Sequence, residues 1–227
     1  MHNVRIVLRI GGSVIASPAN PKLIERYTKL LKRLEELGHE VIAVVGGGAL
    51  AREFIMMGKD LGLSHQQQDW LAIHVSRLYA LFFMLSLGKD RVEINTSIRD
   101  AARALQEGGV VVMGGLEPGM TTDAVAAQAA LEIKAKLLVK ATDQDGVYDK
   151  DPAKYEDAKR LDRMTFSRLA ELFKQRSHEA GLHQILDPVA VETLQKRPIK
   201  TIVVSGFNPE NVMHAIEGKT VGTTITQ

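Results

Sequence analysis

The chain has 227 residues, of which 45% are hydrophobic and 25% charged, a globular composition that excludes wholesale disorder. Its 29 basic and 27 acidic residues give a formal net charge of +2 without a long basic run, so nothing points to nucleic-acid binding. No stretch approaches the roughly 18 apolar residues of a membrane span. The lack of cysteine excludes disulfides, thiolate metal sites and cysteine nucleophiles, and it fits a cytosolic chain.

Hydrophobic patterning predicts strands and helices that alternate along the chain. The first helix is opened by Asn20-Pro21 and stopped by Gly38. We expect strands at 4–10, 41–45, 91–94, 110–113, 137–140, 201–204 and 221–225. Further helices are expected at 49–61, 66–87, 97–107, 123–135, 165–175, 188–195 and 209–216. The segment 142–165 is rich in Asp, Lys and turn formers, which indicates a small hairpin and loop.

This alternation predicts an α/β layered fold with a mainly parallel sheet, whose ligands sit beyond the carboxyl ends of the strands. Glycine clusters at 11–12, 46–48 and 114–115 follow three of these strands. A glycine turn between a strand and a helix lets backbone N–H groups approach an anion. Three such turns on one sheet edge predict a site for a ligand with several phosphates.

Two nucleotide motifs are incomplete. The run Gly46-Gly47-Gly48-Ala49-Leu50-Ala51 fits the dinucleotide pattern, but Asp69, the candidate ribose-binding acid, falls in a helical stretch rather than at a strand end. Gly114 to Thr121 resembles a Walker A loop that lacks its lysine, since Met120 stands there. No histidine spacing suggests a caged metal, so any metal is expected to be Mg²⁺ carried by the nucleotide.

Several motifs together resemble the amino acid kinase superfamily and, within it, the uridine monophosphate kinases of archaeal type. The resemblance covers essentially the whole chain. Its marks are Arg9-Ile10-Gly11-Gly12-Ser13-Val14, Val45 to Arg52, Met113 to Ala124 with its Pro-Gly-Met-Thr-Thr-Asp-Ala core, Thr142 to Tyr148, Asp151-Pro152, Ala180-Gly181, Asp187-Pro188 and Gly222-Thr223-Thr224-Ile225. The Pro-Gly-x-Thr-Thr-Asp-Ala core is the most specific to the uridylate branch.

The resemblance implies a three-layer αβα sandwich that forms one domain over 1–227, with a UMP-binding half at about 1–140 and an ATP-binding half at about 141–227. It implies transfer of the γ-phosphoryl group of ATP to UMP with Mg²⁺, giving ADP and UDP, in cytoplasmic pyrimidine nucleotide synthesis. It also implies a homohexamer built as a trimer of dimers, with UMP and ATP as the ligands and no nucleic-acid or membrane partner.

The resemblance also assigns roles to residues of this chain. Those expected to bind UMP are Gly47, Asp69, Leu116, Glu117, Pro118, Gly119, Met120, Thr121 and Thr122. Those expected to bind ATP are Gly12, Ser13, Gly48, Arg52, Thr142, Asp143, Tyr148 and Asp151. The residues expected to act in catalysis are Arg9, Arg52 and Asp123, with Lys140 as an alternative to Arg9 for the catalytic cation. No protein-held metal ligands are expected.

The chain departs from the family pattern at Arg9, where many members have lysine, at Asp143, where many have asparagine, and at Ala49. Alternatives are therefore another kinase of the superfamily, such as an isopentenyl phosphate, acetylglutamate or carbamate kinase, or a non-catalytic nucleotide-binding protein of the same fold. An isopentenyl phosphate kinase would be expected to carry a histidine soon after the triple glycine, and residues 49–64 contain none.

Overall fold

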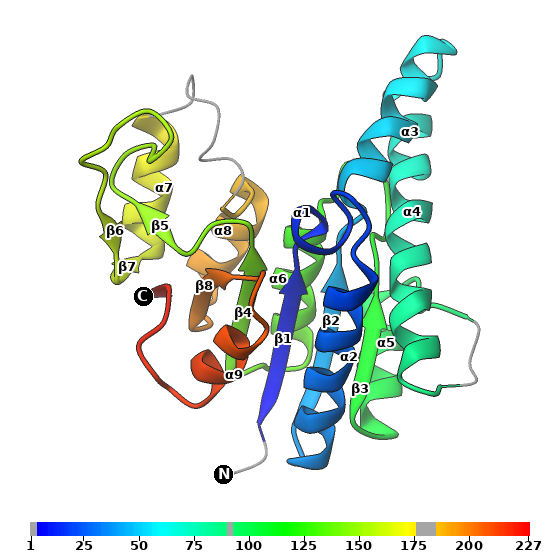
Figure 1. The fold of residues 1–227 in the computed structure, drawn as a ribbon, viewed down its shortest axis with the longest axis horizontal. Coiled ribbons are helices and arrows are strands. Elements are labelled where there is room, and N and C mark those ends of the chain that lie inside the picture. The colour runs from blue at the N-terminus through cyan, green and yellow to red at the C-terminus, as the bar shows by residue number, and fades with distance from the viewer. Residues whose placement is uncertain (1–3, 90–92, 176–184) are drawn as a thin grey trace.

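The structure, a computed structural model, describes residues 4–89, 93–175 and 185–227 (Figure 1). Its strands are β1 (Arg5–Ile10), β2 (Glu40–Val45), β3 (Val110–Met113), β4 (Leu137–Thr142), β5 (Val147–Tyr148), β6 (Arg160–Leu161), β7 (Arg163–Thr165), β8 (Thr201–Ser205) and β9 (Thr223–Thr226). Its helices are α1 (Gly12–Ile15), α2 (Pro21–Glu36), α3 (Gly48–Asp60), α4 (His65–Ser86), α5 (Ile98–Gln106), α6 (Thr122–Glu132), α7 (Phe166–Gln175), α8 (Pro188–Lys196) and α9 (Glu210–Ile216).

One seven-stranded sheet forms the centre, in the order β3-β2-β1-β4-β8-β9-β7. The first five of these strands run parallel to one another, whereas β9 pairs antiparallel with β8 and parallel with β7. Because β3, β2, β1 and β4 are neighbours and parallel, their carboxyl ends meet at one edge of the sheet. The turns that follow these strands therefore lie side by side.

Helices cover both faces of the sheet, so its strands are buried on both sides. Along β2, Val41, Ala43 and Val45 pack into the layer that holds α2, α4 and α9. Ile42 and Val44 pack into the opposite layer with α5, α6, α7 and α8. This explains the continuous apolar runs, which are typical of parallel strands with helices on each face. The three-layer αβα sandwich with a mainly parallel sheet is thus confirmed.

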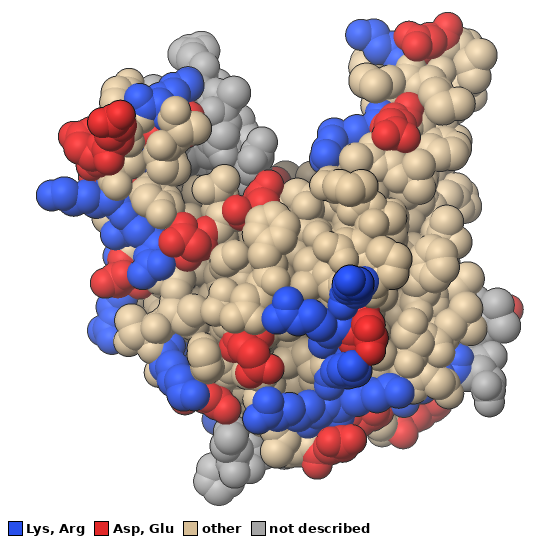
Figure 2. All heavy atoms as spheres, in the orientation of Figure 1, with Lys and Arg blue, Asp and Glu red and all other residues tan. Residues whose placement is uncertain are grey.

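Two parts of the molecule project beyond the carboxyl edge of the sheet. The helical pair α3 and α4 rises on one side, and the hairpin β5–β6 with α7 lies on the other (Figure 1). Figure 2 shows the surface hollowed between these two projections. The fold thus places the turns after the parallel strands at the bottom of this hollow.

Most predicted elements are present, and the differences are local. Residues 93 and 94 lie in no strand, which contradicts the carboxyl half of the strand expected at 91–94, and residues 91 and 92 lie outside the described residues. The sequence analysis also missed the single-turn helix α1 and the short edge strand β7. The hairpin expected within 142–165 is confirmed as β5–β6. Among the described helices, none is long and apolar enough to cross a membrane.

Candidate active site

The glycine turns after β1 and β2 are in direct contact. A Cβ atom on Gly12 would lie 2.2 Å from the nitrogen of Gly48, and one on Gly48 would lie 2.4 Å from the oxygen of Gly12. Gly48 also has a φ of +61°, in the left-handed region that disfavours other residues. Only glycine at both positions allows the two backbones to approach this closely.

Four backbone N–H groups at these two turns have no partner in the part of the chain that the structure describes. They belong to Gly12, Ser13, Gly47 and Gly48. Gly12 and Ser13 begin α1, while Gly47 caps α3 and Gly48 begins it. Unpaired N–H groups at helix starts attract anions, because the donors and the helix dipole both favour negative charge.

These turns form one wall of a cavity of about 620 Å³, here called the donor cavity. Its lining combines glycine backbone with hydroxyl and charged side chains. The residues are Arg9, Gly12, Ser13, Gly46, Gly47, Gly48, Arg52, Thr121, Thr122, Asp123, Lys140, Thr142, Asp143 and Asp187. The cavity brings together six of the eight residues predicted to bind ATP and all three predicted catalytic residues.

A buried ion cluster forms the floor of the donor cavity. Arg9 Nε lies 2.7 Å from Asp123 Oδ1, and Lys140 Nζ lies 2.5 Å from Asp123 Oδ2. Arg9 also donates through Nη2 to Thr122 Oγ1 at 2.9 Å. Arg9 and Lys140 stand in register on the neighbouring strands β1 and β4, so the sheet itself sets both cations beside one carboxylate.

The cluster keeps Asp123 ionised. Burial acts to raise the pKa of Asp123, but the charges of Lys140 and Arg9 outweigh it and hold the pKa below its usual value. Burial lowers the pKa of Lys140, against the attraction of Asp123. Two cations around one carboxylate leave a net positive centre at the floor of the cavity.

Arg52 reaches the donor cavity from the first turns of α3. Its Nη2 donates to Ser17 Oγ at 3.3 Å, and the same oxygen accepts from the N–H of Ala49 at 2.7 Å. Ser17 thus ties the segment after α1 to the start of α3. The guanidinium is exposed and can turn toward a phosphate, which arginine can bind through two parallel hydrogen bonds.

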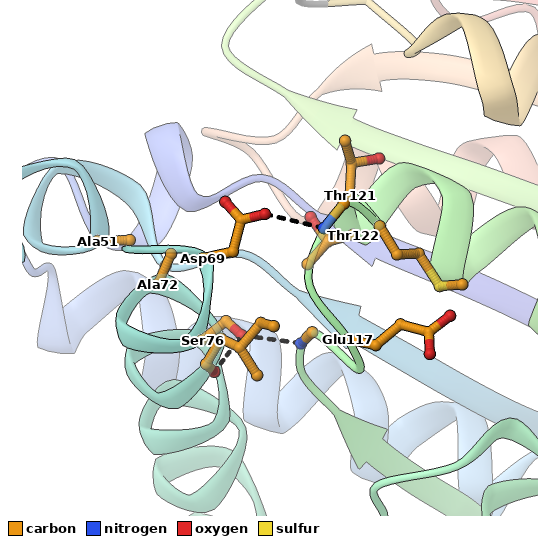
Figure 3. A pocket seen from close by; sticks show the side chains of 12 residues that line it. Ala51, Asp69, Ala72, Ser76, Glu117, Thr121 and Thr122 are labelled. Atoms are coloured by element: carbon orange, nitrogen blue, oxygen red, sulfur yellow. Dashed lines mark hydrogen bonds between the residues drawn. The ribbon is translucent and has the colours of Figure 1, made fainter. Parts of the chain in front are cut away.

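A second cavity, of about 320 Å³ and here called the acceptor cavity, lies between α4 and the loop that joins β3 to α6 (Figure 3). Its lining is mixed apolar and polar, and no lysine or arginine of the described part of the chain belongs to it. The residues are Gly47, Ala51, Asp69, Ala72, Ile73, Ser76, Gly115, Glu117, Gly119, Met120, Thr121 and Thr122. Seven of the nine residues predicted to bind UMP are among them.

Side chains of α4 hold the loop 114–121 from across the acceptor cavity. Asp69 Oδ2 accepts from the N–H of Gly119 at 2.8 Å, and Ser76 Oγ accepts from the N–H of Gly115 at 2.8 Å (Figure 3). Asp69 and Ser76 are seven residues apart and therefore lie on the same face of α4. This arrangement gives Asp69 a structural partner and leaves its other oxygen, Oδ1, for a ligand.

The two cavities meet at Gly47, Thr121 and Thr122, which line both. Thr121 is the N-cap of α6, with its Oγ1 accepting from the N–H of Ala124 at 3.1 Å, and it donates to Asp187 Oδ2. A group that crosses from one cavity to the other must pass these three residues.

Four predicted ligand-binding residues lie outside both linings. Leu116 and Pro118 belong to the loop 114–121, here called the acceptor loop, but line neither cavity. The Tyr148 hydroxyl donates to Asp145 Oδ1 at 2.9 Å. Asp151 Oδ1 accepts from the N–H of Ala153 at 2.9 Å. The roles of these four residues therefore remain predictions. Ala180-Gly181, a mark of the resemblance, lies outside the described residues.

Sequence reasoning missed several residues of the site. Asp187 lines the donor cavity and caps α8 through Oδ1, which accepts from the N–H groups of Val189 and Ala190. An Asp-Pro pair at a helix start signals capping, which explains why its second contact to Thr121 was not foreseen. Ser17 and Ser76 carry no motif signal, because isolated serines are common in any chain.

Comparison with known proteins agrees with this geometry. Residues 4–205 match the amino acid kinase family. The uridylate kinase of Methanocaldococcus jannaschii is 41% identical over 98% of this chain and 99% of its own length, and that of Methanobrevibacter smithii is 36% identical over 98% and 99%.

Solved structures give the same result. The crystal structure of uridylate kinase from Archaeoglobus fulgidus has a TM-score of 0.87 and 35% identity, covering 97% of this chain and 99% of that one. The UMP kinase of Bacillus anthracis has a TM-score of 0.82 at 19% identity, covering 99% and 97%, which shows the shared fold.

Proposed function

The chain belongs to the amino acid kinase family, and from this we infer that it is a uridylate kinase. It transfers the γ-phosphoryl group of ATP to the phosphate of UMP and releases ADP and UDP. The observation that carries this function is the pair of cavities that meet at Gly47, Thr121 and Thr122. The donor cavity suits a polyphosphate, and the acceptor cavity suits a nucleoside.

The charge of the acceptor cavity favours a nucleoside monophosphate over other acceptors of the superfamily. Among the described residues that line it, Asp69 and Glu117 are the only charged ones. Two carboxylates would repel the carboxylates of acetylglutamate, and an isopentenyl tail would leave them without a polar partner. Ribose hydroxyls instead donate hydrogen bonds to such oxygens. The phosphate of the acceptor then lies at the junction, beside the Gly47 N–H and the threonine hydroxyls.

The reaction needs no general base. The second pKa of a phosphate monoester is near 6, so at neutral pH the acceptor is mostly a dianion and already nucleophilic. The difficulty lies in bringing two anions together and aligning them. The unpaired N–H groups of Gly12, Ser13, Gly47 and Gly48, with Arg52, Arg9 and Lys140, supply the neutralising charge. Asp123 holds the two buried cations in place.

Mg²⁺ enters with ATP in this proposal. Three basic residues, Arg9, Arg52 and Lys140, and three acidic residues line the donor cavity, so their formal charges cancel before a triphosphate arrives. Asp143 and Asp187 offer the hard oxygen ligands that Mg²⁺ prefers. Within the described residues, no three metal-binding side chains gather into a site. When bound, the ion would supply positive charge that offsets the negative charge of the transferring phosphates.

The proposal also includes the division of the chain and its assembly. Every residue that lines the acceptor cavity falls within 1–140, which supports a UMP-binding half there, while 141–227 contributes Thr142, Asp143 and Asp187 to the donor cavity and is proposed as the ATP-binding half. We keep the homohexamer as part of the proposal, since exposed apolar side chains on α3 and α4 need cover. They include Phe54, Met56, Met57, Phe82 and Leu85. A cytoplasmic location completes it, since ATP and UMP are available there.

An acceptor panel tests the proposed function. ADP formation from ATP and Mg²⁺ is measured with UMP, CMP, dTMP, isopentenyl phosphate and acetylglutamate offered separately. We expect the highest kcat/KM with UMP. The Asp123→Asn variant, purified in the same way, controls for contaminating kinases and should lose most of the activity. A strong preference for another acceptor, or ATP binding without turnover on any of them, would overturn the proposal.

A further inference from the structure

Besides Asp69 and Ser76, a third side chain of α4 makes hydrogen bonds to the acceptor loop 114–121, and it lines neither cavity. Arg77 on α4 donates from Nε to the carbonyl of Gly115 at 2.9 Å and from Nη2 to the carbonyl of Leu116 at 2.8 Å. The preceding residue, Ser76, accepts a hydrogen bond through Oγ from the N–H of Gly115. Two consecutive residues of α4 therefore fix three backbone groups of two neighbouring loop residues: the N–H and carbonyl of Gly115 and the carbonyl of Leu116.

The contact has a geometry that arginine alone can provide. The guanidinium carries several donors in a rigid, planar fork, so two of them can reach two neighbouring carbonyls at once. Lysine has one flexible ammonium group, which cannot reproduce the fork. The loop also lies close against the helix, since a Cβ on Gly114 would be 2.7 Å from the nitrogen of Arg77. The glycine at 114 thus permits the approach that Arg77 then secures.

The two carbonyl contacts determine where the loop presents its free donors. In a trans peptide the N–H of the following residue points opposite to the carbonyl. The carbonyls of Gly115 and Leu116 face Arg77, so the N–H groups of Leu116 and Glu117 point away from it. Neither N–H has a hydrogen-bond partner among the residues that the structure describes. Gly115 and Glu117 line the acceptor cavity, so the Glu117 N–H is the donor that this part of the loop can present to a ligand there.

The guanidinium is itself held in place. It lies 5.9 Å from the centre of the Trp70 ring, within cation–π range, and its side chain is half-buried. Burial lowers the pKa of Arg77, yet arginine stays charged in proteins. A charged donor makes a stronger hydrogen bond than a neutral one, and a protected position keeps water from competing for the carbonyls.

We propose that Arg77 is a positioning residue for the acceptor nucleotide, because its fork sets the backbone conformation of the loop that binds UMP. This proposal rests on the proposed function for the identity of the acceptor. Arg77 lines neither the acceptor cavity nor the donor cavity as the described residues form them, so its effect reaches the acceptor through the loop and leaves the donor cavity as it is.

The test compares Arg77→Lys with the wild type and with Arg103→Lys. Arg103 lies on α5, is exposed and, within the described ranges, pairs with Asp100 alone across 3.6 Å, so its replacement controls for the chemical change alone. Since a hydrogen bond from a charged donor is lost, we expect the KM for UMP of Arg77→Lys to rise about tenfold or more, with the KM for ATP unchanged. Amides of 114–121 should also exchange hydrogen faster in the ligand-free variant, while those of β3 should not.

Each outcome decides the proposal. Unchanged KM for UMP and unchanged loop exchange would overturn it, as would an equal rise in both KM values together with a lower melting temperature. If the wild type does not phosphorylate UMP, the proposed function fails, and the exchange measurement alone decides whether Arg77 positions the loop. If Arg77→Lys does not fold, Arg77→Gln, which keeps one donor group, takes its place. If neither variant folds, Arg77 is required for the fold as a whole, and this result would overturn its proposed role in positioning the loop.

Discussion

Asp123 accepts a hydrogen bond from Lys140 at 2.5 Å, although both side chains are almost fully buried, at 8% and 2% exposure. Arg9 pairs with the other oxygen of the same carboxylate. Burying charge is unfavourable unless each ion is closely paired. The cluster therefore ties the stability of the fold to the chemistry of the donor cavity.

Removal of the carboxylate should destabilise the protein strongly. Asp123→Ala removes the carboxylate that both Arg9 and Lys140 face in a buried cluster, which should cost about 3–5 kcal/mol of unfolding free energy. Adding Lys140→Met to Asp123→Ala should restore part of this loss, because it removes one of the two buried cations that have lost this carboxylate. Denaturant unfolding of both variants measures the effect.

The exposed pair of Lys196 and Glu192 on α8 is the control for this prediction. Its atoms are 2.7 Å apart, but the side chains are 72% and 63% exposed. Glu192→Ala should therefore change the stability little, because water replaces the partner. If Asp123→Ala were no more destabilising than Glu192→Ala, the buried cluster would not have the role assigned to it.

The contact between the two glycine turns predicts a difference between two glycine positions. Gly48 and Gly62 both have positive φ, of +61° and +73°. A Cβ on Gly62 would meet nothing within 4 Å, whereas one on Gly48 would collide with the carbonyls of Gly12 and Ala16. Gly62→Ala should cost only the left-handed strain of about 1–2 kcal/mol. Gly48→Ala should cost more and should also weaken ATP binding.

Thermal unfolding and ATP titration of these two variants separate the two effects. Equal loss of stability in Gly48→Ala and Gly62→Ala would show that the turns do not need their close approach. Normal ATP affinity in a folded Gly48→Ala protein would remove this turn from the donor site.

Asp69 provides the sharpest test of the acceptor cavity. Asparagine at this position keeps an oxygen that can accept from the N–H of Gly119, but it loses the charge and the second carboxylate oxygen. Because hydrogen bonds to charged groups are the stronger ones, Asp69→Asn should raise the KM for UMP by about tenfold or more while the KM for ATP stays the same. A rise in the KM for ATP alone would contradict the assignment of Asp69 to UMP binding in the acceptor cavity.

Intrinsic tryptophan fluorescence can report ligand binding at the acceptor cavity. The chain contains one tryptophan, Trp70, which follows Asp69 on α4 and lies beside the Arg77 guanidinium. UMP should therefore change the tryptophan emission in the absence of ATP, and the change should shift to higher UMP concentration in Asp69→Asn. Fluorescence titration measures this directly. An emission change produced by ATP but not by UMP would contradict the assignment of the cavities.

Alkaline stability should depend on Tyr27, whose hydroxyl is buried and donates to the carbonyl of Gly206 at 2.8 Å. Burial raises the pKa of this hydroxyl well above its ordinary value of 10.0, so it stays neutral in the folded state while the unfolded chain ionises. The stability that Tyr27 contributes is therefore fully present below about pH 10 and declines as the pH rises further, by up to about 1.4 kcal/mol per pH unit.

Tyr27→Phe isolates this titration from that of other groups. Below pH 10 the variant should be less stable than the wild type, by about 1 kcal/mol for the lost hydrogen bond. Between pH 10 and 11 the difference should shrink, because phenylalanine does not ionise in the unfolded state. Unfolding midpoints from pH 8 to 11 provide the comparison. A constant difference across that range would mean that Tyr27 ionises equally in both states.

Much of the fold follows from local sequence signals. The continuous apolar run 41–45 and the alternation in 4–10 predicted β2 and β1, and Asn20-Pro21 marked the start of α2, where the Asn20 side chain accepts from the N–H of Leu23. The strand expected at 91–94 was wrong at its carboxyl half, because Glu93 and Ile94 form no ladder. The strand β7 was missed because its three residues are paired only by β9, far along the chain.

The residues of the candidate site likewise fall into those that the sequence predicted and those that only the structure revealed. Glycine turns and the Thr-Thr-Asp run carry signals that sequence alone can reveal, and the structure gathers most of them around two cavities. Ser76 and Arg77 were not foreseen, because their function depends on a loop that passes α4 nearly forty residues later. Lys140 was named as a second cation, but its pairing with Asp123 depends on the register of β1 and β4.

The most direct test follows the phosphoryl group itself. The protein is incubated with Mg²⁺, UMP and ATP labelled at the γ-phosphorus, and the products are separated by chromatography. We expect the label to appear in UDP, in an amount equal to the ADP formed, and transfer to fall by orders of magnitude in Arg52→Ala. Label found only in inorganic phosphate, or retained in ATP while UMP is bound, would contradict this expectation.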